Sequence, residues 1–152
     1  MLSLALMGCM EKKGPVGKLA TADAAAGKII AERDCKGCHG LDGKAVAPGI
    51  PHLAAQRDRY LLASVKEYKD GKRTHAALKD MTGNMSDVDL RNVVAYYASL
   101  PPIANAPAKD VQLSSLYQEG KALAAACTKC HGEDGNSKIP GTPTLAGQQP
   151  HY

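Results

Sequence analysis

The sequence contains no tryptophan and no phenylalanine, so its six tyrosines make up its whole content of large aromatic side chains. Such side chains normally supply much of the apolar area that a core buries. A domain of about 80 residues that has few of them rarely builds a sufficient core unaided, and usually needs a metal, a disulfide or a cofactor. We therefore expect a bound group with large apolar faces to replace the missing side chains.

A strong charge of either sign is also absent. The 19 Lys and Arg residues exceed the 15 Asp and Glu residues by a formal net charge of only +4. This balance is compatible with acidic partners or membrane surfaces, but it is too small to predict nucleic-acid binding. We expect no nucleic acid among the partners.

Cysteine, by contrast, occurs in a repeated pattern. Two cysteines three positions apart, followed directly by a histidine, are what covalent attachment of a c-type haem requires. The thiols add to the two vinyl groups of the porphyrin, and the imidazole binds the iron as its proximal ligand. The pattern occurs twice and predicts two covalent haems and electron transfer. The two clusters are Cys35, Cys38 and His39, and Cys127, Cys130 and His131.

Zinc binding and dithiol redox chemistry are the alternatives for these cysteine pairs. In a zinc ribbon the pairs are usually about 15–20 residues apart, whereas here they are about 90 residues apart and each has its own histidine. A thioredoxin-like pair lies beside a βαβ pattern, and this sequence shows no convincing strand. The pattern therefore favours haem.

The fifth cysteine, Cys9, follows a short apolar run over residues 1–8. This run is too short to span a bilayer and is typical of the hydrophobic part of a signal peptide. The segment from Leu6 to Cys9 resembles a bacterial lipobox, in which the cysteine is lipidated, although a buried or free thiol is the alternative. We expect residues 1–20 to be a signal, lipidation site and tether, which would anchor an exported, periplasmic protein to a membrane.

Helical patterns cover residues 21–100 and predict an all-α first domain. Thr21 is expected to cap a helix over residues 22–34. Within that helix, Gly27 costs stability relative to alanine and so indicates a close crossing with another helix. A further helix is predicted over residues 58–70.

The last helix of this domain has the clearest signals. Residues 74–84 before it are expected to be irregular. Ser86 and Asp89 then form an approximate capping box, and a helical stripe of apolar residues follows. The proline- and alanine-rich residues 101–112 are predicted to be an interdomain linker. The stripe consists of Leu90, Val93, Val94 and Tyr97.

A second copy of the first domain begins after this linker. The segment Cys127–Tyr152 repeats Cys35–Tyr60 without a gap, with about half of its positions identical. The spacing from the helix glycine to the first cysteine differs by one residue between the copies. Nothing corresponds to residues 61–100, so residues 113–152 are predicted to be the N-terminal part of a second domain. As given, this part offers no methionine ligand to its iron.

The distal ligand of the first iron has four candidates. Met81 is favoured, because a Gly- and Asn-containing loop can be shaped over a haem face and a Met/His pair raises the potential. Met85 precedes the Ser86 cap, where its natural role is to pack against Leu90. His75 would give a bis-His site of lower potential, and His52 is the remaining candidate.

Together these residues resemble class I cytochromes c, and the tandem arrangement resembles the dihaem cytochrome c4 family. The resemblance covers most of the chain after residue 21. It implies that Gly27 packs against the helix of Tyr96 and Tyr97. The matching features are Gly27-Lys28, Cys35, Cys38, His39, Gly40, Asp42-Gly43, Pro51 to Ala54, Tyr60 to Leu62, Ser86-Asp87 and Ala95 to Ala98.

The resemblance also implies contacts of the iron ligands. The carbonyl of Pro51 is expected to accept a hydrogen bond from Nδ1 of His39, and Pro143 is expected to do the same for His131. In the family, the ligand methionine usually lies seven residues before the apolar residue that precedes the Ser-Asp cap. Counted back from Met85 without a gap, this position holds Leu78. Met81 occupies it if the loop is about three residues shorter.

The resemblance implies a single-electron carrier between a quinol-oxidising complex and a terminal oxidase or other reductase. Such a carrier is not an enzyme, since it makes or breaks no substrate bond. The alternatives are a peroxidase-like haem enzyme and the haem-containing electron-entry subunit of a dehydrogenase. Either of these would need an open iron site.

Overall fold

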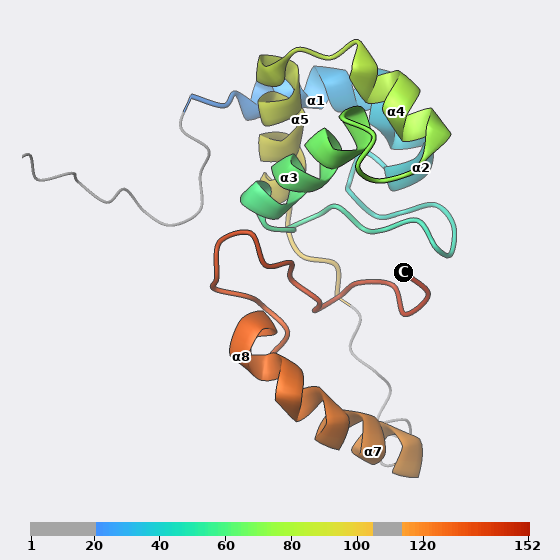
Figure 1. Cartoon of the computed structure of the whole chain (residues 1–152), viewed down its shortest axis with the longest axis vertical. Helices are drawn as coiled ribbons and strands as arrows, with labels where there is room; N and C mark the ends of the chain where they lie inside the picture. The colour runs from blue at the N-terminus through green and yellow to red at the C-terminus, as the bar shows by residue number, and fades with distance from the viewer. Residues whose placement is uncertain (1–20, 105–113) are drawn as a thin grey trace, which may run out of the picture.

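The computed structural model describes residues 21–104 and 114–152, and within these two ranges the regular structure is entirely helical (Figure 1). This confirms the predicted all-α fold. Cys9, the rest of residues 1–20 and most of the predicted linker lie outside the described residues. No helix in the described part is both long and apolar enough to cross a membrane. The elements are α1 (Ala24–Ile30), η1 (Ala31–Cys35), α2 (Lys36–His39), α3 (Asp58–Lys69), α4 (Ala76–Gly83), α5 (Asp87–Ser99), α7 (Ser115–Ala124), η2 (Ala125–Cys127) and α8 (Thr128–His131).

The first helix starts and ends differently from the prediction. Asp23 is its cap, because its carboxylate accepts hydrogen bonds from the backbone N–H groups of Ala25 and Ala26. Thr21 was the wrong choice, since its φ of 70° places it in the left-handed region outside the helix. After Ile30 the backbone continues as the π-helical turn η1 rather than as α-helix.

Gly27 marks the crossing of α1 and α5, as the sequence predicted. A Cβ atom on this glycine would lie 1.9 Å from the carbonyl oxygen of Asn92 and 3.0 Å from the Cβ of Tyr96. Only a residue without a side chain lets the two backbones approach this closely. The side chain of Asn92 also accepts the N–H of Asp23 at 2.8 Å, which ties the start of α1 to α5.

Helix α5 forms the centre of the core. The capping box is present, with the Ser86 hydroxyl accepting the N–H of Asp89 and the Asp89 carboxylate accepting the N–H of Ser86. The predicted apolar stripe is buried, and it packs with Ile30, Leu61 and Met85 in one cluster.

Residues 74–84 were wrongly expected to be irregular. The structure has helix α4 there, and Met81 lies on that helix rather than in a loop. His75 caps it, because its Nδ1 accepts the N–H of Leu78 at 3.3 Å. The run from Ala76 to Met81 contains strong helix formers, and these outweigh the threonine and glycine that follow.

The second unit, residues 114–152, contains α7, η2 and α8, followed by an irregular segment. Ser114 caps α7 by accepting the N–H of Tyr117. The approach to the second motif is the 3₁₀ turn η2, whereas the first motif is reached through the π turn η1. A π turn takes one more residue than an α turn, so it accounts for the one-residue difference in spacing between the copies.

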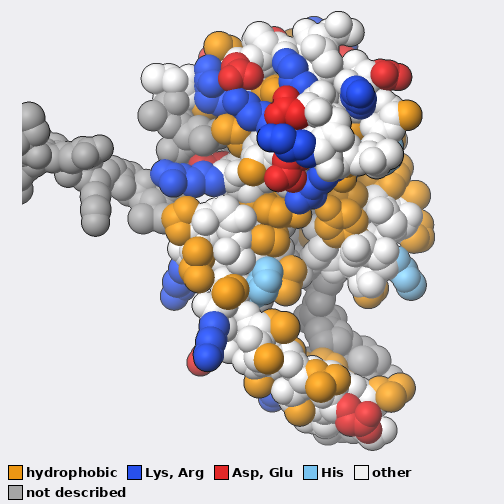
Figure 2. Space-filling model, viewed as in Figure 1, with side chains coloured by type: hydrophobic (Ala, Val, Ile, Leu, Met, Phe, Trp, Pro, Cys, Tyr) orange, Lys and Arg blue, Asp and Glu red, His pale blue; other side chains and the backbone are white. Residues whose placement is uncertain are grey.

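Helix α7 presents apolar side chains to solvent. Leu116 and Leu123 are each 78% exposed, and Figure 2 shows hydrophobic side chains along this helix. A Cβ atom added to Gly120 would meet nothing within 4 Å. The face that α1 buries against α5 is therefore open on α7 in the described part of the chain.

Two glutamines at equivalent repeat positions join the two units. The side chain of Gln56 accepts the N–H of Thr144 at 2.7 Å and donates to its carbonyl at 2.8 Å. The side chain of Gln148 accepts the N–H of His52 at 2.8 Å and donates to its carbonyl at 3.0 Å. His52 and Thr144 also occupy equivalent positions of the repeat. Each glutamine therefore binds the backbone of the other unit at the same repeat position, which gives the contact approximate two-fold symmetry. It holds the segment after α8 beneath the first unit (Figure 1).

Candidate functional site

The first motif faces a partly open cavity of about 670 Å³. This volume lies within the range of roughly 300–1,000 Å³ that is typical of ligand pockets. Its lining is largely apolar and comes mainly from α3, α4, α5 and the loop around Pro51, with Pro143 to Gln149 of the second unit closing one part. The motif residues in its wall are Cys35, Cys38 and His39.

Both motif histidines make the contact that the resemblance implied. Nδ1 of His39 lies 3.0 Å from the carbonyl oxygen of Pro51, and Nδ1 of His131 lies 2.9 Å from that of Pro143. A carbonyl oxygen can only accept, so each Nδ1 carries the hydrogen and each Nε2 is left with a free lone pair. Burial lowers the pKa of His39 and favours its neutral form. A neutral imidazole with a free Nε2 is what a metal ion binds.

The cysteines are available for attachment. Cys35, Cys38, Cys127 and Cys130 are all free thiols. Burial, and then the neighbouring Asp34 carboxylate, raise the pKa of Cys35 to about 11, so this thiol is protonated at neutral pH. Within residues 21–104 and 114–152, no group of three or more His, Cys, Asp or Glu side chains could hold a metal ion. The zinc alternative therefore finds no ligand set there.

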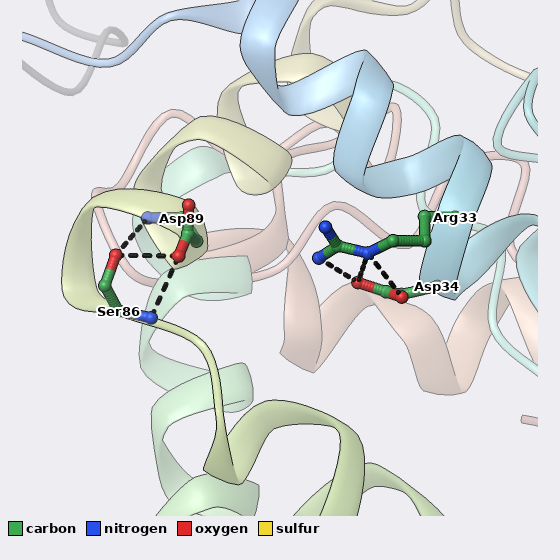
Figure 3. Close-up of polar contacts among 4 residues, drawn as sticks. All are labelled: Arg33, Asp34, Ser86 and Asp89. Carbon is green, nitrogen blue, oxygen red and sulfur yellow. Dashed lines mark hydrogen bonds and ion pairs between the residues drawn. The ribbon is translucent and has the colours of Figure 1, made fainter.

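The acidic group beside Cys35 is neutralised by its own neighbour. Arg33 donates to the Asp34 carboxylate through Nε at 2.9 Å and through Nη2 at 2.7 Å. Asp34 belongs to the cavity wall, while Arg33 is exposed. Figure 3 shows this pair on η1 and, separately, the capping box of Ser86 and Asp89 at the start of α5. Arg33 therefore balances the negative charge of Asp34 beside the Cys35 thiol, and Arg33 is not part of the cavity wall.

The candidate distal ligands differ in their surroundings. Met81 and Met85 both line the cavity, but Met85 is buried at 7% exposure in the same cluster as Leu90, where it is committed to packing. Nδ1 of His75 accepts the N–H of Leu78, and Nδ1 of His52 accepts the N–H of Ala45 at 2.9 Å.

A histidine whose Nδ1 accepts a hydrogen bond carries its hydrogen on Nε2 when the ring is neutral. Neither His52 nor His75 therefore presents a lone pair at Nε2. Met81 also packs against this cluster, but it is only partly buried there and lines the cavity.

Two tyrosines of α5 hold the loop that follows the first motif. The Tyr97 hydroxyl donates to the carbonyl of Gly40 at 3.1 Å, and the Tyr96 hydroxyl donates to that of Leu41 at 2.8 Å. These bonds satisfy carbonyl groups next to His39 and couple the loop to the core helix.

Sequence reasoning missed the residues that complete this site from outside the motifs. Gln56 and Gln148 are identical at matched repeat positions, which is a signal, but nothing in the sequence says that they face one another. Ser64 lines the cavity with a buried Oγ that has no hydrogen-bond partner among the described residues. No periodicity marks this residue.

The residues present fit a covalently bound haem. The space is large and apolar, and two free thiols and an imidazole with a free Nε2 stand in its wall. Haem c supplies an iron that gains and loses one electron. In this chain Cys35 and Cys38 would hold the porphyrin and His39 its iron.

Comparisons with known proteins agree with this site. The pattern of the family described as Cytochrome c matches residues 24–101 and 117–152. A cytochrome c4 from Pseudomonas aeruginosa is 40% identical over 138 residues, which span 88% of this chain and 68% of that protein. A thiosulfate dehydrogenase electron acceptor from Thiomonas intermedia is 28% identical over 161 residues, spanning 99% of this chain and 70% of that protein.

A solved structure supports the same assignment. The crystal structure of reduced recombinant cytochrome c4 from Pseudomonas stutzeri superposes with a TM-score of 0.74 at 29% identity, covering 84% of this chain and 74% of that one. The agreement extends over both units. The chain therefore belongs to the cytochrome c family and, within it, to the cytochromes c4, electron-transfer proteins with covalently bound haem c.

Proposed function

We propose that this chain carries two haems, one on each motif, and transfers single electrons. In the first unit His39 is the proximal ligand and Met81 the distal ligand. In the second unit Cys127 and Cys130 hold the haem and His131 binds its iron. The observation that carries this proposal is the matched contact of both motif histidines with a proline carbonyl, which leaves both Nε2 atoms free.

The electron donor and acceptor are proposed by class. We propose a quinol-oxidising complex as donor and a terminal oxidase or other reductase as acceptor. Residues 1–20 would direct export to the periplasm, and a lipid on Cys9 would keep the carrier at the membrane surface, where both partners lie. Intact mass of the mature protein tests the anchor, because a diacylglyceryl-modified cysteine at the N-terminus has a characteristic added mass.

Haem stoichiometry tests the first part of the proposal. The pyridine haemochrome spectrum and intact mass of the chain, expressed in a host competent in cytochrome maturation, should give two haems per chain. Replacing Cys127 and Cys130 by serine should leave one. A single haem in the unchanged chain would refute a second site, and a colourless folded protein would refute the whole proposal.

The distal ligand is tested by a pair of methionine variants. Met81→Leu should abolish the near-infrared charge-transfer band that marks sulfur ligation of ferric haem, and should lower the potential because the thioether stabilises ferrous iron. Met85→Leu is the matched control and should keep the band, since it replaces one packed side chain by another of similar volume. Loss of the band in Met85→Leu alone would assign the ligand to Met85.

A second candidate function is electron acceptance from a dehydrogenase. The similarity to the Thiomonas intermedia thiosulfate dehydrogenase electron acceptor favours it. Carbon monoxide binding separates an electron-entry subunit or a peroxidase-like enzyme from a simple carrier, because a haem with both axial positions filled binds little. We expect the first haem of the reduced protein to bind little carbon monoxide, and Met81→Leu to bind it readily.

A further inference from the structure

The proline carbonyl that binds the first motif histidine belongs to a peptide group with a second hydrogen bond. The carbonyl of Pro51 and the N–H of His52 are the two ends of this peptide group. The carbonyl accepts the Nδ1–H of His39 at 3.0 Å, and the N–H donates to Oε1 of Gln148 at 2.8 Å. One peptide group therefore connects the first motif histidine to a side chain of the second unit.

The second motif has the same arrangement with the two units exchanged. The carbonyl of Pro143 accepts the Nδ1–H of His131 at 2.9 Å. At the other end of that peptide group, the N–H of Thr144 donates to Oε1 of Gln56 at 2.7 Å. Because Gln56 belongs to the first unit, each unit supplies the acceptor for the peptide group behind the other unit's histidine.

The oxygen of each glutamine is also held from its own unit. Oε1 of Gln148 accepts the N–H of Gln149 at 3.0 Å, and Oε1 of Gln56 accepts the N–H of Arg57 at 2.9 Å. Gln56 is buried and Gln148 is half-buried. Hydrogen bonds away from water are electrostatically stronger than those in water. The two acceptors are therefore fixed in place, where they act strongly on the peptide groups that they bind.

Hydrogen bonds in such a chain polarise one another. A peptide N–H that donates to a glutamine oxygen leaves more negative charge on the carbonyl oxygen of the same peptide group. This carbonyl accepts more strongly from the histidine Nδ1–H, which makes Nε2 of the ring a stronger electron donor. A stronger axial donor stabilises ferric over ferrous iron, and it therefore lowers the midpoint potential.

We infer that Gln148 tunes the first haem and Gln56 tunes the second, each across the contact between the units. Both are positioning residues, since each acts through a peptide group and not on the iron ligand itself. The inference rests on the proposed haems. It makes the potential of each haem depend on docking of the two units, because a glutamine that leaves its peptide group no longer polarises it.

The test uses the full chain with both haems. NMR is recorded on the reduced chain under carbon monoxide, which fills any open axial position and keeps the iron diamagnetic, so each motif histidine gives its own Nδ1–H resonance. Gln148→Met removes the amide but keeps a side chain of similar length. It should move the His39 resonance upfield and leave that of His131 almost unchanged. Gln56→Met should have the converse effect.

The potential of the first haem is the second readout. Without carbon monoxide, it is followed in the full chain through the charge-transfer band of methionine-ligated ferric haem, which the second unit does not give. Gln148→Met should raise this potential, because it weakens the donor that stabilises ferric iron. Gln56→Met should leave it almost unchanged, although Gln56 lies in the first unit and lines the first cavity.

Two variants separate tuning from docking. Gln149→Met is the matched control, because Nε2 of Gln149 donates across the units to the carbonyl of Ala47 at 3.1 Å and binds neither proline peptide group. It should leave both resonances in place. At neutral pH, Gln148→Glu keeps an acceptor for the His52 N–H but cannot donate to the His52 carbonyl. It should therefore weaken docking and still keep the His39 resonance downfield.

Upfield shifts of the His39 resonance of similar size in Gln148→Met, Gln149→Met and Gln148→Glu would overturn the inference, because docking alone would explain them. Unmoved resonances in both Gln148→Met and Gln56→Met would also overturn it. Haem content distinguishes the two levels. Variants that retain both haems with unmoved resonances refute only the tuning, whereas absence of haem from the unchanged chain refutes the proposed function.

Discussion

The two units of the chain fold the same loop in different surroundings. In the first unit the N–H of Leu53 donates to the carbonyl of Gly43 at 2.9 Å, and in the second the N–H of Leu145 donates to that of Gly135 at 2.8 Å. The φ angles of these glycines are 76° and 75°. The loop and its histidine–proline contact therefore follow from the local sequence, since they form with and without a full set of helices around them.

The helices that lead into the motifs show the opposite behaviour. Helix α1 is buried against α5, and η1 brings Cys35 into the cavity wall. Helix α7 packs against no such helix in the described part of the chain, and neither Cys127 nor Cys130 lines the first cavity. The comparison shows that local sequence shapes the motif, whereas the apolar cavity beside it needs α3, α4 and α5.

The largest expected contrast comes from the two helix glycines. Gly27→Ala should destabilise the first unit by about 1–3 kcal/mol, because overpacking displaces a close backbone contact. Gly120→Ala, the same change on an open face, should instead stabilise α7 by about 0.5–1 kcal/mol. Denaturant unfolding with circular dichroism measures both. Changes of the same sign in the two variants would contradict the different packing of α1 and α7.

The symmetric contact between the units gives the next largest effect. Gln56→Ala leaves the backbone groups of Thr144 without partners, which should weaken docking of the second unit by about 1–3 kcal/mol. Hydrogen exchange at the Thr144 amide should accelerate. Gln148→Ala is the reciprocal variant and should expose the His52 amide in the same way. Unchanged exchange at both amides would mean that the glutamines do not hold the units together.

Loss of a tyrosine hydroxyl should have a smaller effect, confined to the first unit. Tyr97→Phe removes the hydrogen bond to Gly40 and should reduce stability by about 0.5–1.5 kcal/mol. Tyr117→Phe in α7 is the matched change in the second unit and should have less effect, because α7 packs on no helix in the described part. Thermal unfolding compares the two, and an equal loss in both variants would argue against the anchoring role of Tyr97.

The smallest effect concerns the capping box of α5 and its pH dependence. Hydrogen bonds from Ser86 lower the pKa of Asp89 below its ordinary value of 3.8. A carboxyl whose folded pKa is lowered stabilises the fold above the unfolded pKa, and this contribution disappears as the pH falls through the folded value. The stability difference between the unchanged chain and Ser86→Ala should therefore shrink below pH 3.8. Denaturant unfolding at pH 6 and pH 3 tests this, and a constant difference would contradict the pairing.

Patterns that depend on neighbours in sequence were the most predictable. The cap at Ser86, the stripe on α5 and the crossing at Gly27 all follow from spacing and side-chain size, and the structure confirms them. Two predictions were wrong. Thr21 was expected to cap the first helix, but several kinds of polar residue can cap a helix, and Asp23 does so here. Residues 74–84 were expected to be irregular, but one glycine does not prevent a helix, and Ala76–Gly83 form one.

The sequence alone determined the two attachment motifs, the repeat and the all-α fold, because each depends on contacts between residues close in the chain. Only the tertiary structure decided that Met81 and Met85 line the same cavity, how Gln56 meets the second unit, and that Ser64 and Arg73 share one wall. These features depend on which faces of helices that are distant in sequence pack together. The spacing of residues within one helix does not reveal which side chains of another helix will surround them.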